Sequence, residues 1–180
     1  PRNHLWVTTG DAGTEELSAD PDSLAGKVLR LNPDGTAPGD NPDVGDPRVY
    51  SYGHRNPQAI AFLPDGTLVV TEHGPSARDE VVVVERGRNH GWPEVRSGGE
   101  DDQYGRYGES DGVTNPLVNT GPEETWAPSG GVFYTGEAVP ALRNRLLVGG
   151  LRSQTLFSIS VHGGDAPEMG GARYDDAWLH

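Results

Sequence analysis

The sequence contains no cysteine, and this absence excludes several kinds of chemistry. Thiol catalysis, iron–sulfur clusters and cysteine-ligated zinc sites all require a thiolate. No disulfide can form either, so the sequence leaves the redox compartment open.

Basic residues and long apolar runs are also scarce. The sequence has 14 Lys and Arg residues against 27 Asp and Glu residues, and its formal net charge is −13. Such a chain lacks the positive surface that neutralises phosphates, so we expect no nucleic-acid partner. No run approaches the roughly 20 apolar residues of a membrane-spanning helix, so we expect no membrane span.

Turn-forming residues are abundant, with 26 glycines and 15 prolines among 180 residues. That content is typical either of low-complexity disorder or of a β fold with many turns, and the regular apolar segments favour the second. These segments are short and rich in β-branched and aromatic residues. We expect strands at Leu5–Thr9, Lys27–Leu31, Val49–Tyr52, Ala59–Leu63, Thr67–Thr71, Glu80–Glu85, Gly131–Thr135, Arg145–Val148 and Thr155–Ser160.

Turn signals and a weak repeat favour an all-β propeller. Asp65 and Gly66 lie between two apolar runs and predict a hairpin, since both residues tolerate positive φ. The segments Asn3–Val7, Gly66–Val70 and Asn144–Val148 each place Leu-x-Val after a turn residue. The long spacings between these three segments suit propeller blades with long loops. No long amphipathic helical pattern is present, so a doubly wound α/β sheet is not expected.

Two polar stretches, Gly39–Pro47 and Ser97–Asn119, are predicted to be loops because they lack apolar periodicity. The first carries Asp40, Asp43 and Asp46 at intervals of three. An EF-hand loop instead places its first ligands at positions one, three and five. We therefore expect a solvated acidic loop there.

Three segments carry a family resemblance: Tyr52–Gln58, Glu72–Glu80 and Asn89–Pro93. They resemble the Gly-His-Arg-Asn-Pro-Gln, Gly-Pro-then-Asp-Glu and Asn-x-Gly-Trp-Pro motifs of the glucose/sorbosone dehydrogenase family, which are soluble aldose dehydrogenases dependent on pyrroloquinoline quinone (PQQ). The supporting motifs follow in the same order along the chain. They are Leu5–Asp11, Gly26–Asn32 and Ala127–Gly130, and the resemblance extends from Leu5 to about Phe157.

The resemblance implies both a fold and an activity. It implies a six-bladed β-propeller, of which residues 1–180 form part of one domain, roughly its middle half. It implies oxidation of an aldose at the anomeric carbon to a lactone, with PQQ and calcium as cofactors and an external electron acceptor. It also implies a periplasmic or extracellular location.

Two other functions are compatible with a propeller fold. One is a non-catalytic extracellular interaction module, since fold alone does not imply function. The other is a calcium-dependent lactonase or hydrolase, which would surround its metal with carboxylates. The joint presence of Arg55, Asn56, Gly74, Pro75 and Asp79 argues against the module, because a scaffold has no need of this set.

Arg55 and Asn56 are the first candidates for cofactor binding. PQQ is a planar tricarboxylate, and an arginine fork can bind a carboxylate through two parallel N–H donors, with the Asn56 amide as a further donor. Without the motif, a surface ion pair and a turn asparagine would be the ordinary interpretation. By resemblance, Asp79, Thr125 and Arg152 also lie at cofactor-binding positions.

Gly74 and Pro75 are the candidates for holding calcium. A bent Gly-Pro segment can aim two carbonyl oxygens at one point, and calcium accepts such ligands. The resemblance gives this pair the catalytic calcium, and it matches Glu80 and the backbone of His90 to calcium positions of some relatives. For Asp79 and Glu80, an exposed acidic turn is the alternative.

None of the six histidines is assigned a catalytic role. The resemblance places the general-base histidine upstream of Pro1, so neither His54 nor His73 inherits it. It also places a second arginine segment after Trp178. We therefore expect the 180-residue chain alone to be inactive, as a cofactor platform without a complete active site.

Overall fold

The computed structural model describes residues 3–93 and 113–161 of the chain. The chain divides into two compact units. Unit 1 contains Pro1–Pro57 and Val84–Pro116, and unit 2 contains Gln58–Val83 and Leu117–His180. No helix in the described residues is long and apolar enough to cross a bilayer.

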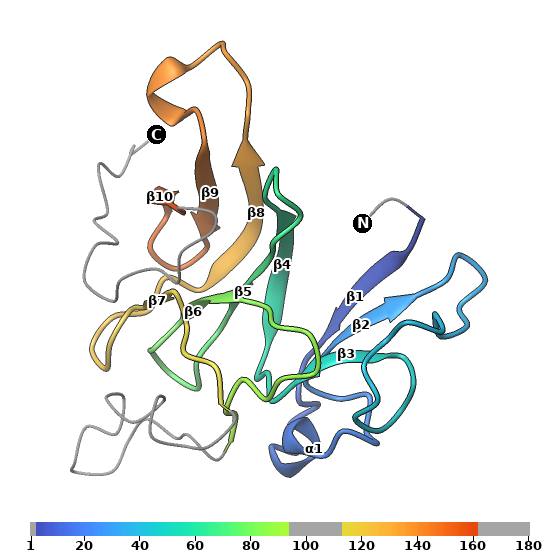
Figure 1. The fold of residues 1–180 in the computed structure, drawn as a ribbon. Helices are drawn as coiled ribbons and strands as arrows, with labels where there is room; N and C mark the ends of the chain where they lie inside the picture. The colour runs from blue at the N-terminus through green and yellow to red at the C-terminus, as the bar shows by residue number, and fades with distance from the viewer. Residues whose placement is uncertain (1–2, 94–112, 162–180) are drawn as a thin grey trace. The chain divides into compact units, whose positions relative to one another are not determined.

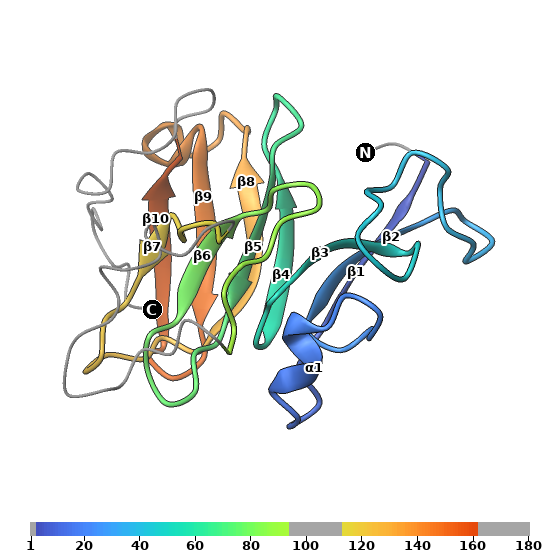
Figure 2. The same ribbon diagram turned by 60° about the horizontal axis from the view of Figure 1, so that its bottom comes forward.

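Unit 1 is built on an antiparallel sheet with the order β1-β2-β3. Its elements are β1 (Leu5–Thr9), the short helix α1 (Glu16–Ala19), β2 (Lys27–Leu31) and β3 (Val49–Tyr52), as seen in Figure 1 and Figure 2. Val28 and Val49 are completely buried, because β-branched side chains fill the inner face of the pleated sheet.

Lys27, the single lysine of the sequence, attaches α1 to this sheet. Its side chain is completely buried. Its Nζ donates to the carbonyl oxygens of Leu17 and Ser18, each at 2.9 Å, and also to that of Ala25. These carbonyls end the four-residue helix α1 and the turn that follows it, so one buried cation organises residues 17–25.

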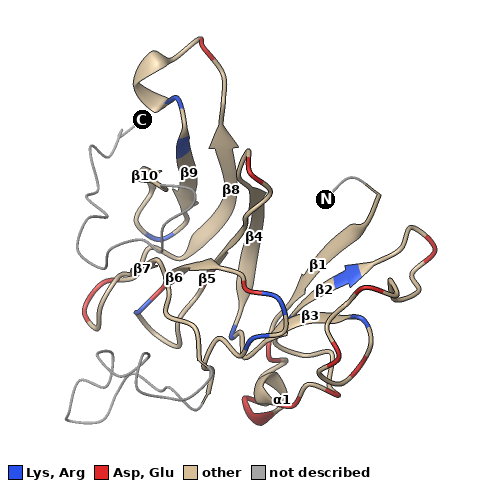
Figure 3. Ribbon diagram, viewed as in Figure 1, with Lys and Arg blue, Asp and Glu red and all other residues tan. Residues whose placement is uncertain are grey.

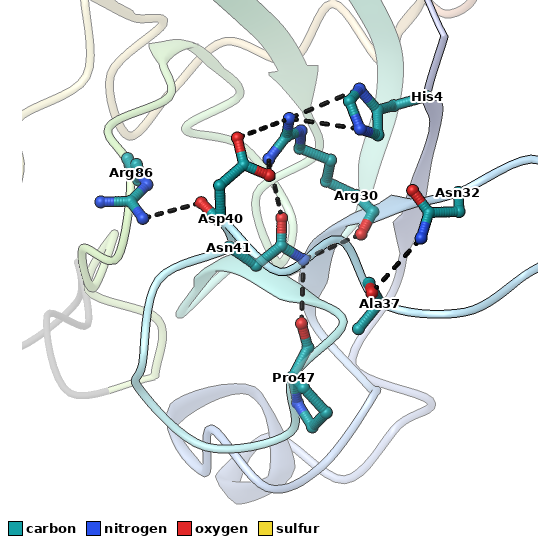
Figure 4. Close-up of polar contacts among 8 residues, drawn as sticks. All are labelled: His4, Arg30, Asn32, Ala37, Asp40, Asn41, Pro47 and Arg86. Atoms are coloured by element: carbon teal, nitrogen blue, oxygen red, sulfur yellow. Dashed lines mark hydrogen bonds and ion pairs between the residues drawn. The ribbon is translucent and has the colours of Figure 1, made fainter.

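The acidic loop at residues 39–47 is attached to β2 through Arg30 (Figure 4). The Arg30 guanidinium donates to Asp40 Oδ1 at 2.8 Å, to Asp40 Oδ2 at 3.1 Å and to Asn41 Oδ1 at 3.1 Å. The Asn41 amide in turn donates to the carbonyl oxygens of Arg30 and Pro47, each at 2.9 Å. The loop is therefore ordered by arginine and amide contacts, although the Asp40 side chain is 74 % exposed.

Unit 2 contains two sheets, with the strand orders β4-β5-β6-β7 and β10-β9-β8. Their elements are β4 (Pro57–Phe62), β5 (Leu68–Glu72), β6 (Glu80–Val83), β7 (Val118–Asn119), β8 (Pro128–Tyr134), the 3₁₀ helix η2 (Pro140–Leu142), β9 (Arg145–Gly150) and β10 (Thr155–Ser160).

The two sheets of unit 2 share one hydrophobic core. Every residue of β5 is buried, and side chains of the first sheet such as Val69 and Val81 pack with Leu146 of the second. Trp126 is 2 % exposed and stacks on Phe157 with 3.9 Å between ring centroids. Aromatic burial of this extent makes Trp126 a core residue.

The all-β prediction is confirmed, and each predicted strand has a counterpart. The hairpin turn at Asp65 and Gly66 is also confirmed. Gly66 has a φ of +93°, and Asp65 Oδ1 accepts a hydrogen bond from the Thr67 N–H at 2.9 Å. The blade size expected of a propeller, four strands, occurs in one sheet, whereas the other two have three strands among the described residues.

The predicted loop at Ser97–Asn119 is wrong at its end, where β7 (Val118–Asn119) pairs with β6. Residues 97–112 of that loop lie outside the described residues. Two residues are too few to show a strand periodicity, which explains why the pattern missed β7. The helix α1 was missed because its four residues are too few to show a helical periodicity.

Candidate cofactor site

One buried carboxylate organises the loop that joins β5 to β6. Asp79 is 2 % exposed. Its Oδ1 accepts from the Gly74 N–H at 3.0 Å. Its Oδ2 accepts from Thr125 Oγ1 at 2.9 Å and from the backbone N–H groups of Trp126 at 2.6 Å and Ala127 at 2.8 Å. Hydrogen bonds to an ionised acceptor are the strong ones, so this carboxylate holds two distant segments together.

The backbone of Asp79 is fixed as well. Its N–H donates to Thr120 Oγ1 at 3.0 Å, and its carbonyl oxygen accepts from the Thr120 N–H at 3.0 Å. Next along the chain, Glu80 Oε1 accepts from Asn119 Nδ2 at 2.9 Å. The acidic pair is thus built into the sheet, and the alternative of an exposed acidic turn is wrong, since both residues are buried.

Hydrogen bonds link four of the predicted site residues within unit 2. Asp79 binds Gly74 and Thr125 directly, as described above. The Arg152 N–H donates to the Trp126 carbonyl oxygen at 3.1 Å, next to the Trp126 N–H that binds Asp79. The predicted residues Gly74, Asp79, Thr125 and Arg152 therefore share one end of unit 2, with the Arg152 side chain exposed.

The Gly74-Pro75 loop is tight, and position 74 requires glycine. A Cβ added to Gly74 would run into the carbonyl oxygens of Ala77 and Arg78. Arg78 itself has a φ of +65°. Pro75 lies exposed at the tip of the loop. Main-chain oxygens on such an exposed bend are ligands of the type that calcium takes.

No group of three or more His, Asp or Glu side chains that could hold a metal occurs in residues 3–93 and 113–161. The assignment of calcium to Gly74, Pro75, Glu80 and the backbone of His90 therefore stays a prediction. Its support is the family resemblance of the Gly74-Pro75 segment.

In unit 1, the predicted cofactor ligand Arg55 is oriented by Trp92 and Asp11. The Arg55 guanidinium carbon lies 5.7 Å from the centroid of the Trp92 ring, within the range of a cation–π contact. Asp11 Oδ2 accepts from Trp92 Nε1 at 3.0 Å, and the Asp11 N–H donates to the Arg55 carbonyl oxygen at 2.8 Å. Both supporting residues lie in the motifs, yet neither was predicted as a site residue.

Two histidines of unit 1 are buried against each other. The rings of His54 and His90 stack with 4.6 Å between centroids, and Ser51 Oγ lies 2.8 Å from His54 Nε2. Burial, with the Lys27 charge as a smaller cause, lowers the pKa of His54 to about 3. Burial also lowers the pKa of His90 well below its usual value. Both rings therefore stay neutral, and neither has the exposure that a general base needs.

The His73 side chain in unit 2 binds a backbone carbonyl group. Its Nε2 lies 2.9 Å from the Pro128 carbonyl oxygen, so this nitrogen carries the hydrogen and donates it. The contact ties the end of β5 to the start of β8. This structural role agrees with leaving His73 without a catalytic assignment.

The predicted site residues are divided between the two units. Gly74, Pro75, Asp79, Glu80, Thr125 and Arg152 lie in unit 2, and Arg55, Asn56 and His90 lie in unit 1. Convergence of both groups on one cofactor stays a prediction.

Comparison with known proteins identifies the family. The family model for glucose/sorbosone dehydrogenase matches residues 1–173. The chain belongs to the glucose/sorbosone dehydrogenase family. This membership confirms the resemblance that the motifs carry.

Two curated relatives of this family are dehydrogenases by name. Quinoprotein glucose dehydrogenase B of Acinetobacter calcoaceticus is 33% identical over 159 residues, which are 77% of this chain and 33% of that protein. Aldose sugar dehydrogenase YliI of Escherichia coli K12 is 30% identical over 181 residues, which are 94% of this chain and 47% of that protein. The chain thus spans less than half the length of these relatives.

Solved structures of the family have the same fold as this chain. The PQQ-bound form of aldose sugar dehydrogenase from Streptomyces coelicolor matches with a TM-score of 0.74 and 33% identity, covering 97% of this chain and 45% of that one. The apo-form of the Escherichia coli enzyme matches with a TM-score of 0.76 and 29% identity, covering 90% and 49%. The glucose/sorbosone dehydrogenase fold therefore extends over nearly all of this chain.

Proposed function

We propose that the protein carrying this chain oxidises an aldose at its anomeric carbon to a lactone, with PQQ and calcium as cofactors. The observation that carries the proposal is the buried Asp79 carboxylate, which joins Gly74 to Thr125 through 3.0 and 2.9 Å hydrogen bonds. These are positions that the family resemblance assigns to cofactor and metal. An external electron acceptor and an exported location belong to the same proposal.

The architecture we propose is a six-bladed propeller to which this chain contributes roughly the middle half. The antiparallel sheets of the described residues support it. So do the matches to family structures, of which this chain covers 45 to 49%. A blade also places its loops at the ends of the strands, where the Gly74–Asp79 loop lies.

The residues present fit a planar tricarboxylate and a hard cation. When bound, PQQ supplies an ortho-quinone that accepts the hydride of the sugar. Arg55 offers a guanidinium fork for a carboxylate, and the Trp92 ring beside it restrains that fork. Asn56 is half-buried next to Arg55 and supplies an amide donor.

Asp79 acts in this proposal by positioning the loop. Its acceptor sites are occupied by Gly74, Thr125, Trp126 and Ala127, so it holds the Gly74-Pro75 bend instead of presenting a free carboxylate. Fixed carbonyl oxygens need no reorganisation when they take a cation. Calcium held there would act as a Lewis acid toward the cofactor.

The alternative of a non-catalytic propeller module is less well supported, because the named relatives are dehydrogenases. A titration with PQQ tests the choice directly. We expect quinone absorbance changes when an aldose is added to the reconstituted protein, together with dye reduction. A protein that takes up no PQQ would refute the proposal.

Arg55→Ala supplies the site-specific test. We expect it to weaken PQQ reconstitution by about 10- to 100-fold, since a bidentate charge-assisted contact is lost. Arg88→Ala is the control, because Arg88 is 54% exposed and pairs with Glu85 at 3.5 Å. Equal PQQ affinity of the two variants would remove Arg55 from the site.

A further inference from the structure

Unit 2 contains a pocket that is remote from the candidate cofactor loop. The β4–β5 turn and the connection from β8 to β9 lie at the same end of this unit in both Figure 1 and Figure 2. Between them is a pocket of about 670 Å³. The volume falls in the range of small-molecule sites, roughly 300 to 1,000 Å³.

This pocket and the candidate cofactor loop lie at opposite ends of β5. Leu63, Pro64 and Asp65 line the pocket and precede β5, whereas Gly74 to Asp79 follow it. A five-residue strand extends about 17 Å at roughly 3.3 Å per residue. The pocket residues therefore do not overlap with the predicted cofactor or metal residues.

The floor of the pocket is apolar and continuous with the core. Leu63 is 5% exposed and belongs to the buried core cluster of unit 2. Phe133 and Val161 also line the pocket and pack against the same cluster. A ligand seated here would contact rigid apolar side chains, of which Phe133 offers a ring.

Two arginines stand on the pocket wall, placed by a single turn. Asn144, between them, has a φ of +59°, and its N–H donates to the Tyr134 carbonyl oxygen at 2.8 Å. Arg145 is anchored, because its guanidinium donates through Nε to Ser158 Oγ and through an Nη to the Ser158 carbonyl oxygen at 3.1 Å. Ser158 thus fixes one guanidinium before any ligand arrives.

The other arginine, Arg143, can exchange its present partner for a ligand. Arg143 is 55% exposed and lies 3.6 Å from Glu137, whose side chain is 81% exposed. Exposed ion pairs of this kind contribute little, so an anion in the pocket can replace Glu137 as the partner of Arg143. Arg143 and the bound anion would then form an ion pair that is less exposed to water than the present pair of Arg143 with Glu137.

The pocket is lined by charged groups of both signs. Figure 3 shows Lys and Arg colour at the start of β9 and acidic colour at the β4–β5 turn. The acidic group there is Asp65, which lines the pocket. Its Oδ1 accepts from the Thr67 N–H at 2.9 Å, within its own turn. Arg143 and Arg145 therefore line the pocket together with Asp65, and Glu137 is the present partner of Arg143.

We propose that this pocket binds a small organic carboxylate with an apolar or aromatic body. The carboxylate would pair with Arg143 and Arg145, and the body would rest on Phe133, Leu63 and Val161. Guanidinium geometry matches a carboxylate through parallel hydrogen bonds, and an apolar floor with few polar groups on its rim is the usual anatomy of such a site.

Benzoate is the probe, and benzamide is its neutral isostere, with binding to the whole protein followed by ligand-observed NMR titration. We expect benzoate to bind about tenfold more tightly than benzamide. Arg143→Gln should weaken benzoate binding about tenfold. The matched control is Arg88→Gln, which removes an arginine of 54% exposure with a weak glutamate partner at 3.5 Å and should leave affinity within about twofold.

Asp65→Asn provides a test of opposite sign. It keeps the Oδ1 acceptor for the turn but removes the rim carboxylate, so benzoate should bind about two- to threefold more tightly. Equal affinities for benzoate and benzamide would overturn the proposal. So would equal effects of Arg143→Gln and Arg88→Gln, or a protein that binds no benzoate.

Discussion

Unit 1 buries basic side chains, whereas unit 2 buries acidic ones, namely Glu72, Asp79 and Glu80. In unit 1, Lys27, His54 and His90 are all buried, and burial lowers the pKa of each, to about 8 for Lys27. In unit 2, Asp79 is buried among backbone N–H groups and one hydroxyl. The main chain therefore supplies the compensation in both units, with carbonyl oxygens around the lysine and amides around the aspartate.

This difference predicts how strongly each unit should depend on its buried charged residue. The Asp79 contacts join segments that are 46 to 48 residues apart, so the carboxylate sets the relation between two parts of unit 2. The Lys27 contacts reach back only 2 to 10 residues and close a local turn. Loss of the aspartate should therefore be the more damaging change, both to stability and to the candidate loop.

Replacement of Asp79 by asparagine tests the larger effect. The asparagine NH₂ group would face N–H donors that the carboxylate now satisfies, so we expect a loss of about 3 to 5 kcal/mol in the free energy of unfolding. Urea denaturation measures it. Asp65→Asn, in an exposed turn with its own cap retained, is the matched control and should leave the midpoint unchanged. Equal midpoints for the two variants would contradict the role of Asp79.

Lys27→Met tests the corresponding feature of unit 1. The variant keeps an unbranched apolar chain but removes the Lys27 donor from the Leu17 and Ala25 carbonyl oxygens, whereas the Ser18 carbonyl keeps the Gly53 N–H as a donor at 2.8 Å. We therefore expect a loss of about 2 to 3 kcal/mol, measured in the same urea assay. Arg48→Met is the control, because Arg48 is 41% exposed and pairs with Asp46 at the surface. A Lys27→Met protein as stable as the parent would show that the carbonyls are satisfied in another way.

The sequence predicted the strands well because their signal is local. Leu5–Thr9 and Lys27–Leu31 were predicted with the bounds that β1 and β2 have, and Asp65 and Gly66 form the expected turn. Apolar alternation and turn chemistry act within a few residues, where a single sequence can be interpreted. The two-residue β7 depends on its pairing with β6, and no local pattern signals that.

The candidate site was predictable only through its motifs. They pointed to Asp79, but its partners at Thr125, Trp126 and Ala127 come from a distant segment, so its positioning role could not be predicted locally. Lys27 was interpreted as an ordinary strand residue because no local pattern signals its burial. Its burial depends on how residues 17–25 fold over β2.

Acid titration tests the two buried histidines of unit 1, His54 and His90. His54 and His90 stay neutral when folded, whereas an unfolded histidine binds a proton below about pH 6.5. The unfolded state then binds more protons, so stability is present above pH 6.5 and is lost as pH falls toward 3. Each ring should contribute a slope of about 1.4 kcal/mol per pH unit below pH 6.5 for as long as it stays neutral in the folded state, which for His54 extends to about pH 3.

His90→Phe isolates one of these two rings. The variant keeps an aromatic ring for the stack on His54 and cannot titrate, so its stability should fall less steeply below pH 6.5 than that of the parent. Urea unfolding at a series of pH values measures both curves. Parallel curves for the two proteins would show that His90 does not carry the acid sensitivity.

Asp40→Asn should have the smallest effect, although Asp40 has a charged partner in Arg30. Arg30 holds the pKa of Asp40 below its ordinary value, mainly through their hydrogen bonds. The Asp40 side chain is nevertheless 74% exposed, so water replaces Arg30 at little cost when the charge is removed. We expect a small decrease in the urea midpoint at low salt that disappears at high salt, where screening weakens the parent pair. A decrease as large as that of Asp79→Asn would mean that a partner's charge matters more than burial in this protein, and the contrast between the two carboxylates would fail.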